Sequence, residues 1–427
     1  MQGVKGWLVA LLIALLLSGC LAGQPSGKEA EGTLQVLVPD PGFFYQRYGN
    51  AFESRYPKVK LEVSRAEGDS AKAISEGGID AAIVSMANYR RLVDEGDLSP
   101  LDNLWSREEM NGFSPEIIRL LTNSGAEALY GFAPTYRHIG VYYNRDLFER
   151  LGIAPPTDRM TWQELLELSR RVSESAGDEN LQGLVVEGAY TVFDLIELAA
   201  RSEGLTYTDA SQENIHIQSE EWERVFRLVL DELKAEAGLA EWLNGRRGPQ
   251  DFYVDNPFRK GQAAMMLAGS SMIDLLASTA APGGTNALNF GIVTAPVSER
   301  NRTGSAYYDF TDIFTIAKDA DNHAAAQELI RFVAGVEWAQ VHGKTSHELL
   351  THTKGRSGDP ALEPFYSLPP VSVQPRNLPD KLRSGVRDIV NREAERWLQQ
   401  PQQPIAEWLE ALQDKLQLQL DTQQAAD

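Results

Sequence analysis

The residues best suited to catalysis lie in one short segment near residue 350. His347-Glu348-Leu349-Leu350-Thr351-His352 is close to the HExxH motif of zinc proteases, with one residue too many. The second histidine would lie about 140° around a helix from the first, whereas a metal needs both on one face. His342 adds a third histidine at the same spacing of five, which no regular helix or strand gathers. We therefore expect a solvated loop here and no bound metal.

Other signatures of enzymes are absent from the sequence. It contains no phosphate-binding loop, no GxSxG turn and no Gly-rich dinucleotide turn. The single cysteine, Cys20, lies in the N-terminal segment and is not a plausible nucleophile. Carboxylates are abundant, but the sequence does not show that any two converge. A hydrolase is thus possible but unsupported, and we expect no catalytic residue and no cofactor.

Side chains suited to ligand binding are better represented. Aromatic residues occur at or near the ends of several predicted strands: Phe43, Phe44, Tyr45, Tyr136, Tyr190, Tyr253, Tyr307 and Tyr308. Flat rings with polar edges suit sugars, peptides or cationic headgroups. The alternative for each ring is a place in the core, and Phe44 and Tyr45 could equally begin a helix that runs to Tyr56.

The elements that would position these side chains are clearest between residues 129 and 172. Ile139, Val141 and Tyr143 alternate as a strand, and Asn144 follows as the cap of a short helix that ends at Gly152. After a proline-rich turn, Thr161 and Glu164 have the spacing of a capping box at the start of a second helix. The pattern predicts a strand that leaves one compact body and enters another.

This order of strand, YYN, short helix, glycine, TW and helix resembles the family 1 extracellular solute-binding proteins of ABC importers, the maltose-binding-protein-like class. The resemblance implies an α/β fold of the periplasmic-binding-protein-like II type, with two lobes joined by hinge strands around a ligand cleft. It implies lobe 1 over 33–138 plus 298–335 and lobe 2 over 139–297 plus 336–427. The chain would then cross between lobes near 138, 297 and 336.

The resemblance also implies cleft-facing residues at strand ends in both lobes. Met86 and Asn88 would face the cleft at the carboxyl end of a buried strand over 81–86, and Arg137 would precede the first crossing. The family segment F-x-x-G-x-AAM matches Phe258 to Met265, but Ser270 and Ser271 stand where many sugar-binding members carry a stacking tryptophan. That departure puts an ordinary sugar ligand in some doubt.

A second departure from the family pattern adds polar groups to the expected cleft. Tyr307, Tyr308, Asp309 and Asp312 replace the usual glycines, although both aspartates could also be solvated turn residues. The carboxylates would grip a polyhydroxylated saccharide, which we favour, or pair with a cationic solute. The paired tyrosines also resemble those of iron-binding members of the wider fold, but the sequence places no histidine or carboxylate to complete a metal shell.

The N-terminus has the features of a lipoprotein signal. Lys5 precedes an apolar run over 7–17, and Leu17-Ser18-Gly19-Cys20 matches a bacterial lipobox. The run is too short for a membrane-spanning helix, which favours a signal peptide over 1–19 that is cleaved. Cys20 would carry the lipid, and 20–32 would be the lipidated cysteine with a flexible tether. A chance buried cysteine is the alternative.

Composition sets the remaining expectations. A chain of 427 residues with 43% apolar residues can form two or three domains. Its net charge of −20 argues against nucleic acid as a partner. Together with the lipobox, the resemblance implies a monomeric, lipid-anchored protein on the outer face of the cell membrane that delivers a solute to an ABC permease. The alternatives are a ligand-sensing or assembly lipoprotein of the same fold, or a peptide, polyamine or metal as ligand.

Overall fold

The computed structural model of the protein describes residues 30–66, 68–122, 128–177, 181–209, 213–235, 237–243, 248–278, 288–371, 378, 380–399 and 403–425. The expected signal peptide, Cys20 and most of the tether lie outside these residues. None of the helices in the described ranges has both the length and the apolar character needed to cross a membrane.

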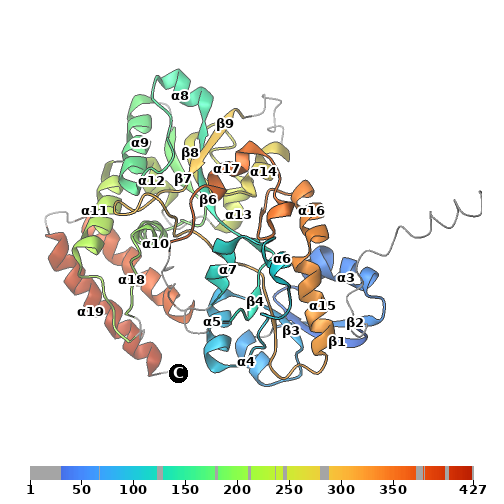
Figure 1. The fold of residues 1–427 in the computed structure, drawn as a ribbon. Helices are drawn as coiled ribbons and strands as arrows, with labels where there is room; N and C mark the ends of the chain where they lie inside the picture. Colours follow the sequence, from blue (N-terminus) through green and yellow to red (C-terminus); the bar gives the residue numbers. More distant parts are fainter. Residues whose placement is uncertain are drawn as a thin grey trace, which may run out of the picture.

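A first body is built on a five-stranded sheet of order β2-β1-β3-β10-β4. Its strands are β1 (Gly32–Val38), β2 (Val59–Arg65), β3 (Ala81–Val84), β4 (Gly131–Phe132) and β10 (Ile313–Ile316). β1 runs parallel to β2 and β3, whereas β10 runs antiparallel to β3 and β4. The helices of this body include α2 (Pro41–Phe44), α3 (Asn50–Arg55), α4 (Ser70–Ser75), α5 (Met86–Glu95), α7 (Pro115–Leu121) and α15 (His323–Ala334). Figure 1 shows this body at the lower right.

A second body is built on a four-stranded sheet of order β7-β8-β6-β9. Its strands are β6 (Ile139–Asn144), β7 (Gln182–Val186), β8 (Ala263–Gly269) and β9 (Phe290–Thr294). The helices around it include α8 (Arg145–Leu151), α9 (Trp162–Ser175), α10 (Val192–Ser202), α11 (Glu220–Ala235), α12 (Ala237–Trp242), α13 (Pro249–Val254) and α14 (Met272–Ser278). Two long C-terminal helices, α18 (Asp380–Gln399) and α19 (Ile405–Gln424), pack beside α10 and α11 at the left of Figure 1.

The local signals between residues 139 and 164 are confirmed. The Asn144 side chain accepts a hydrogen bond from the Leu147 N–H and caps α8, which ends at Gly152 with a φ of 65°. Thr161 and Glu164 form the capping box of α9. β6, however, is an inner strand of the second sheet between β8 and β9, so it lies beyond the connection between the bodies.

Three chain segments run side by side where the bodies meet. The Arg137 and Asp309 backbones exchange hydrogen bonds of 2.8 and 3.0 Å. Ser305 exchanges backbone bonds with Pro369 and Val371 in the third segment. The buried His138 ring stacks on Tyr308, and its Nε2 lies 2.7 Å from the Ser305 hydroxyl. The segments around 137 and 309 form two connections between the bodies, whereas 369–371 follows α17 (Glu363–Tyr366) and belongs to the second body.

Two of the three connections lie later in the chain than the expected positions of 297 and 336. Val297 is still held in the second body, because its N–H donates to Met160 O. α16 (Val336–Thr345) directly follows α15 and packs on the first body, where the Trp338 ring stacks on Tyr48 at 5.5 Å. β11 (Leu349–Leu350) then pairs with β5 (Thr135–Tyr136). The third connection therefore comes after β11, before α17 (Glu363–Tyr366), which packs against β6 and β9.

Candidate functional site

One polar cluster lies where the strands of the second sheet end beside the connection. Because β7 and β8 are parallel neighbours, Glu187 and the Ser270–Ser271 turn follow them at the same edge, and Arg137 reaches this edge just before β6 begins. We call Arg137, Glu187, Tyr253 and Ser271 the Glu187 cluster. Carboxyl ends of strands in α/β sheets are where ligands commonly bind.

Glu187 is the centre of this cluster. One carboxylate oxygen accepts a hydrogen bond from the Gly269 N–H at 2.8 Å, and the other accepts from the Tyr253 hydroxyl. Arg137 Nη2 lies 3.7 Å from the second oxygen. Burial and the Glu187 charge raise the pKa of Tyr253, which keeps its hydroxyl protonated as a donor. Tyr253 is 39% exposed and Ser271 is exposed, so the cluster faces solvent.

The turn after Glu187 is held in place by hydrogen bonds from α12 and α10. Trp242 Nε1 donates to Ala189 O at 3.0 Å, and the buried Asp194 accepts from the N–H groups of Tyr190 and Thr191 at 3.2 and 3.0 Å. Asp194 also lies 3.3 Å from Arg387 of α18. The turn that presents Glu187 and the half-buried Tyr190 is thus fixed by both α10 and a C-terminal helix.

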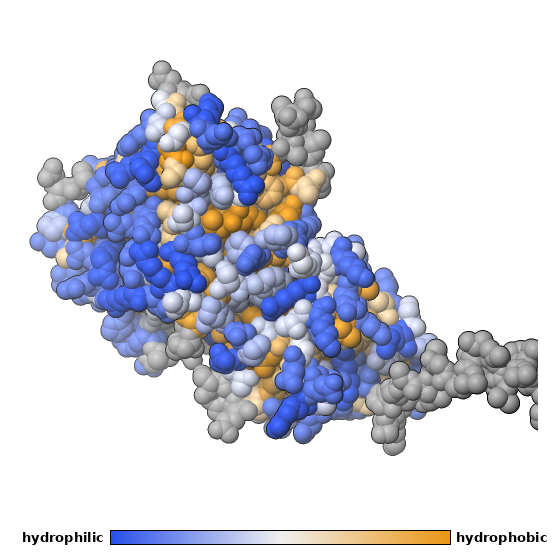
Figure 2. Space-filling model, turned by 45° about the horizontal axis from the view of Figure 1, so that its top comes forward, coloured by the Kyte–Doolittle hydropathy of each residue, from blue (hydrophilic) through white to orange (hydrophobic). Residues whose placement is uncertain are grey.

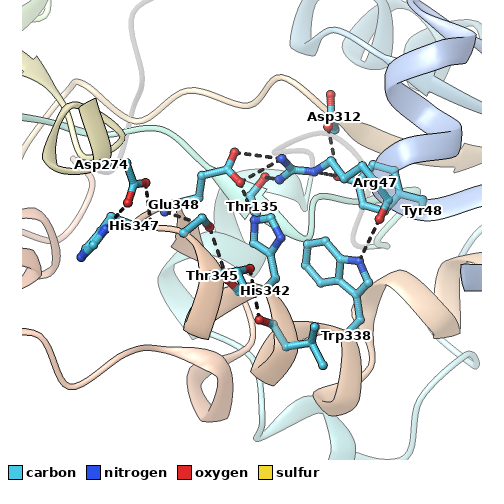
Figure 3. Close-up of polar contacts among 12 residues, drawn as sticks. Arg47, Tyr48, Thr135, Asp274, Asp312, Trp338, His342, Thr345, His347 and Glu348 are labelled. Atoms are coloured by element: carbon cyan, nitrogen blue, oxygen red, sulfur yellow. Dashed lines mark hydrogen bonds and ion pairs between the residues drawn. The ribbon is translucent and has the colours of Figure 1, made fainter. Parts of the chain in front are cut away.

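A second polar network lies on the first body and is drawn in Figure 3. Arg47 bonds to the Tyr48 hydroxyl at 2.7 Å and pairs with Glu348 at 2.8 Å, while Glu348 also bonds to His342. The Tyr48 hydroxyl donates to Asp312 at 3.0 Å. Burial would lower the pKa of Arg47, but Tyr48 and Glu348 outweigh it and raise the pKa, so the guanidinium stays charged and is neutralised locally.

His347 joins the two bodies next to this network. Its Nδ1 lies 2.5 Å from Asp274 of α14, which follows β8 in the second body, and its Nε2 lies 3.0 Å from Asp359. A hollow of about 650 Å³ opens beside it, lined by Asp274, His347 and the cations Lys344, Lys354 and Arg356 among others. Another of about 470 Å³ lies on the first body, between Trp105, Arg331 and Trp338.

The bridge through His347 should strengthen on acidification. Burial lowers the pKa of His347, but its bonds to Asp274 and Asp359 outweigh this and raise it above the usual 6.5. A raised folded-state pKa means that the stabilisation is complete below about pH 6.5 and is lost as pH rises through the folded value. We expect the stability difference between wild type and His347→Asn, from urea unfolding, to shrink from pH 6 to pH 8.

Two further variants test this pH dependence. Asp274→Asn should reduce it, whereas His216→Asn, which changes an exposed histidine of the second body, should leave it unchanged. The three cations that line the neighbouring hollow oppose protonation of His347 but are common to every variant. An equal stability difference at pH 6 and pH 8 would rule out protonation of His347 as its source.

The predicted binding residues divide by burial. Phe43, Arg137, Tyr253, Ser271 and Asp309 are exposed. Tyr45, Met86, Asn88, Tyr190 and Asp312 are partly buried. Phe44, Tyr136, Ser270, Tyr307 and Tyr308 are buried. Only Arg137, Tyr253 and Ser271, with Tyr190 beside them, are brought together around Glu187.

The two adjacent tyrosines are packing residues in this structure rather than cleft residues. The Tyr307 hydroxyl accepts from Trp162 Nε1 at 2.6 Å and donates to Leu198 O at 2.9 Å. Tyr308 lies between His138 and Tyr136 and donates its hydroxyl to Leu368 O. A ligand could reach neither phenol without breaking these contacts. Phe44 and Tyr136 are likewise packed in the core.

The predicted polar residues Asp309, Asp312 and Asn88 are bonded within the protein at separate places. One Asp309 oxygen accepts from the Phe310 N–H at 2.9 Å. Asp312 is bonded to Tyr48, and burial raises its pKa. Asn88 bonds to Ser70 at 2.7 Å. The expectation that the aspartates supply the ligand contacts thus finds no geometric support.

The histidine-rich segment differs from the expected solvated loop. His342 lies on α16, while His347 and His352 lie on either side of β11, whose leucines are buried. Within the described ranges, no group of three histidine, cysteine, aspartate or glutamate residues is placed to hold a metal ion.

Sequence reasoning missed Glu187, Asp274 and the Arg47 network. Glu187 had a usable signal in the sequence, because it is the first charged residue after the apolar run Leu184-Val185-Val186. Glu348, which pairs with Arg47, is 301 residues away in the sequence, so no local pattern could have revealed this ion pair.

Two α/β bodies joined by three connections, with polar clusters where strands end beside them, define a two-lobed fold of the periplasmic-binding-protein-like II type. The family model for the bacterial extracellular solute-binding proteins matches residues 37–340, and the chain belongs to that family.

Relatives support this assignment at low identity. A binding protein of Brucella abortus strain 2308 is 22% identical over 344 residues, which are 78% of this chain and 79% of the relative. An ABC substrate-binding protein of Listeria monocytogenes, solved with cycloalternan, superposes with a TM-score of 0.62 at 17% identity, over 91% of this chain and 98% of its own. A cyclic α-maltosyl-1,6-maltose-binding protein of Arthrobacter globiformis gives 0.65 at 14% identity, over 92% and 100%. Family and neighbours are binding proteins of transporters rather than enzymes.

Proposed function

We propose that this protein captures a saccharide between its two lobes and delivers it to an ABC permease. The observation that carries the proposal is the exposed Glu187 cluster at the strand ends of the second lobe, beside the connection. Neighbours of the same fold were solved with cycloalternan and with D-mannitol, which supports a carbohydrate ligand. The protein would act as a monomer.

The cluster offers the two kinds of contact that a sugar needs. Tyr253 presents a partly exposed ring for the apolar face of a pyranose, while Glu187 and Arg137 accept from and donate to hydroxyls. Phe43, 51% exposed after β1, offers another ring on the first lobe. Figure 2 shows hydrophobic side chains gathered on the second lobe near the junction, within a mostly hydrophilic face.

We infer lobe boundaries from the same contacts. Lobe 1 would comprise residues 33–137 with 309–356, and lobe 2 would comprise 138–306 with 360–425. Closure would bend the three connections between the lobes while both sheets stay intact, and a ligand that touches both lobes would favour the closed form.

Calorimetric titration with neutral and acidic oligosaccharides tests the proposed site. For a sugar that binds, we expect Glu187→Gln and Tyr253→Ala to weaken binding by about tenfold or more, because each removes a contact in a desolvated site. Val254→Ala and Glu174→Gln are matched controls, since both side chains are exposed and outside the cluster. Wild-type affinity in both cluster variants would place the sugar elsewhere.

We also propose that Cys20 is acylated and holds the protein at the outer face of the cell membrane, on the basis of the apolar run and lipobox in the sequence. Cys20→Ala should release the protein or leave its signal uncleaved, as membrane fractionation and mass spectrometry would show. A membrane-bound variant with a cleaved signal would contradict the anchor.

A further inference from the structure

Arg137 is the exposed cation of the Glu187 cluster, and its guanidinium is only loosely paired. Its side chain is 55% exposed, and its one ion pair among the described residues is the 3.7 Å approach to Glu187. That separation exceeds hydrogen-bonding distance, so the donors of the planar fork remain available on the solvent side.

Two carboxylates lie beside Arg137, and each accepts a hydrogen bond from another group. Asp309 shares backbone bonds with Arg137 but accepts the Phe310 N–H with its own side chain. Glu187 is mostly covered, with a side chain 9% exposed, and its oxygens accept from Gly269 and Tyr253. A ligand that approaches this surface therefore meets the guanidinium before it meets the carboxylate.

The backbone fixes where this cation lies. The Arg137 and Asp309 backbones exchange two hydrogen bonds. The following residue, His138, is fully buried against Tyr308. These contacts place the Arg137 backbone in the first connecting segment, and its side chain lies at Glu187 with that of the partly exposed Tyr253. Arginine binds carboxylates through two parallel N–H···O bonds, which makes this exposed fork well suited to a planar anion.

We propose that the saccharide bound here is acidic, with the carboxylate of a uronic acid residue paired to Arg137 and a sugar face against Tyr253. This inference rests on the proposed function and names the ligand class for that site. The net charge of −20 does not oppose it strongly, because charges beyond about 8 Å are screened at physiological salt whereas a contact pair is not. A guanidinium–carboxylate pair should favour the acidic sugar by about ten- to a hundredfold over a neutral homologue.

The test compares matched sugars on matched variants. Oligogalacturonates and oligoglucuronates are titrated by calorimetry against the neutral galactose and glucose oligomers, with sulfated and phosphorylated sugars as further anions. Arg137→Gln should lose the preference for acidic sugars while keeping any binding of neutral ones. Arg145→Gln removes an exposed arginine from the far end of β6 and should keep the preference. Thermal melting checks that each variant is folded.

Each outcome decides a different point. A preference of tenfold or more for uronates that disappears in Arg137→Gln supports the inference. Equal binding of neutral and acidic sugars, or an unchanged uronate affinity in Arg137→Gln, overturns it and leaves the proposed function standing. Tighter binding of sulfated or phosphorylated sugars overturns the assignment to a carboxylate. Failure of every sugar to bind the folded protein overturns the proposed function, and this inference with it.

Discussion

Gly343→Ala is expected to destabilise the protein by about 3 kcal/mol, at the upper end of the usual cost of overpacking. A Cβ atom at this position would lie 1.9 Å from the carbonyl oxygen of Gly355 and 3.0 Å from Leu350 Cδ1. The first of these atoms is backbone, so α16 and the turn that contains Gly355 would have to separate. The midpoint of urea unfolding measures the loss.

Gly358→Ala is the matched control for this prediction. It lies in the same part of the chain, but nothing is within 4 Å of the position of its Cβ. Its stability should stay within about 0.5 kcal/mol of wild type. If the two variants unfold at the same urea concentration, the close approach of α16 and Gly355 is not a requirement of the fold. A loss confined to Gly343→Ala would show that it is.

Asp194→Ala should have an effect of similar size, about 3 kcal/mol, and should also weaken ligand binding. The substitution removes two backbone hydrogen bonds at Tyr190 and Thr191 and leaves Arg387 without its closest carboxylate. Asp194 itself is buried, so its removal leaves two N–H groups of the turn without their acceptor, which is costly, while the partly exposed Arg387 adds less. The turn after Glu187 would lose its anchor, so we expect weaker binding of a sugar as well as earlier unfolding.

The control for Asp194 is an aspartate with an ordinary surface ion pair. Asp231 on α11 is exposed and lies 3.5 Å from Lys234, so Asp231→Ala should change stability by less than about 1 kcal/mol and leave ligand affinity unaltered. Thermal melting and calorimetric titration on the same preparations separate the two effects. Wild-type affinity in a destabilised Asp194→Ala would show that the turn after Glu187 does not depend on this anchor.

The sequence predicted those parts of the fold that depend on neighbouring residues. The caps at Asn144 and Thr161 and the helical stop at Gly152 follow from local hydrogen bonding and backbone geometry, and the structure confirms each. The two-lobed fold was implied by the family resemblance that the order of these segments carries.

The parts that could not be predicted depend on contacts between distant segments. Tyr307 was expected at the cleft, but Trp162 and Leu198 take its hydroxyl. The crossing expected near 336 lies later in the chain, because Trp338 stacks on Tyr48 and keeps α16 on the first body. A ring at a strand end has the same local pattern in a core and in a binding site, so the sequence alone does not separate the two.

The position of β10 inside the first sheet has a consequence for the folding of a newly made chain. β10 lies between β3 and β4, yet the chain reaches it only after passing from residue 132 to residue 313 through the whole second sheet. A nascent polypeptide that emerges N-terminus first would therefore present β3 and β4 with unpaired edges until its late strand arrives. Pairings of such large sequence separation form slowly. Translation and export should therefore be nearly complete before the first lobe gains protection from proteases.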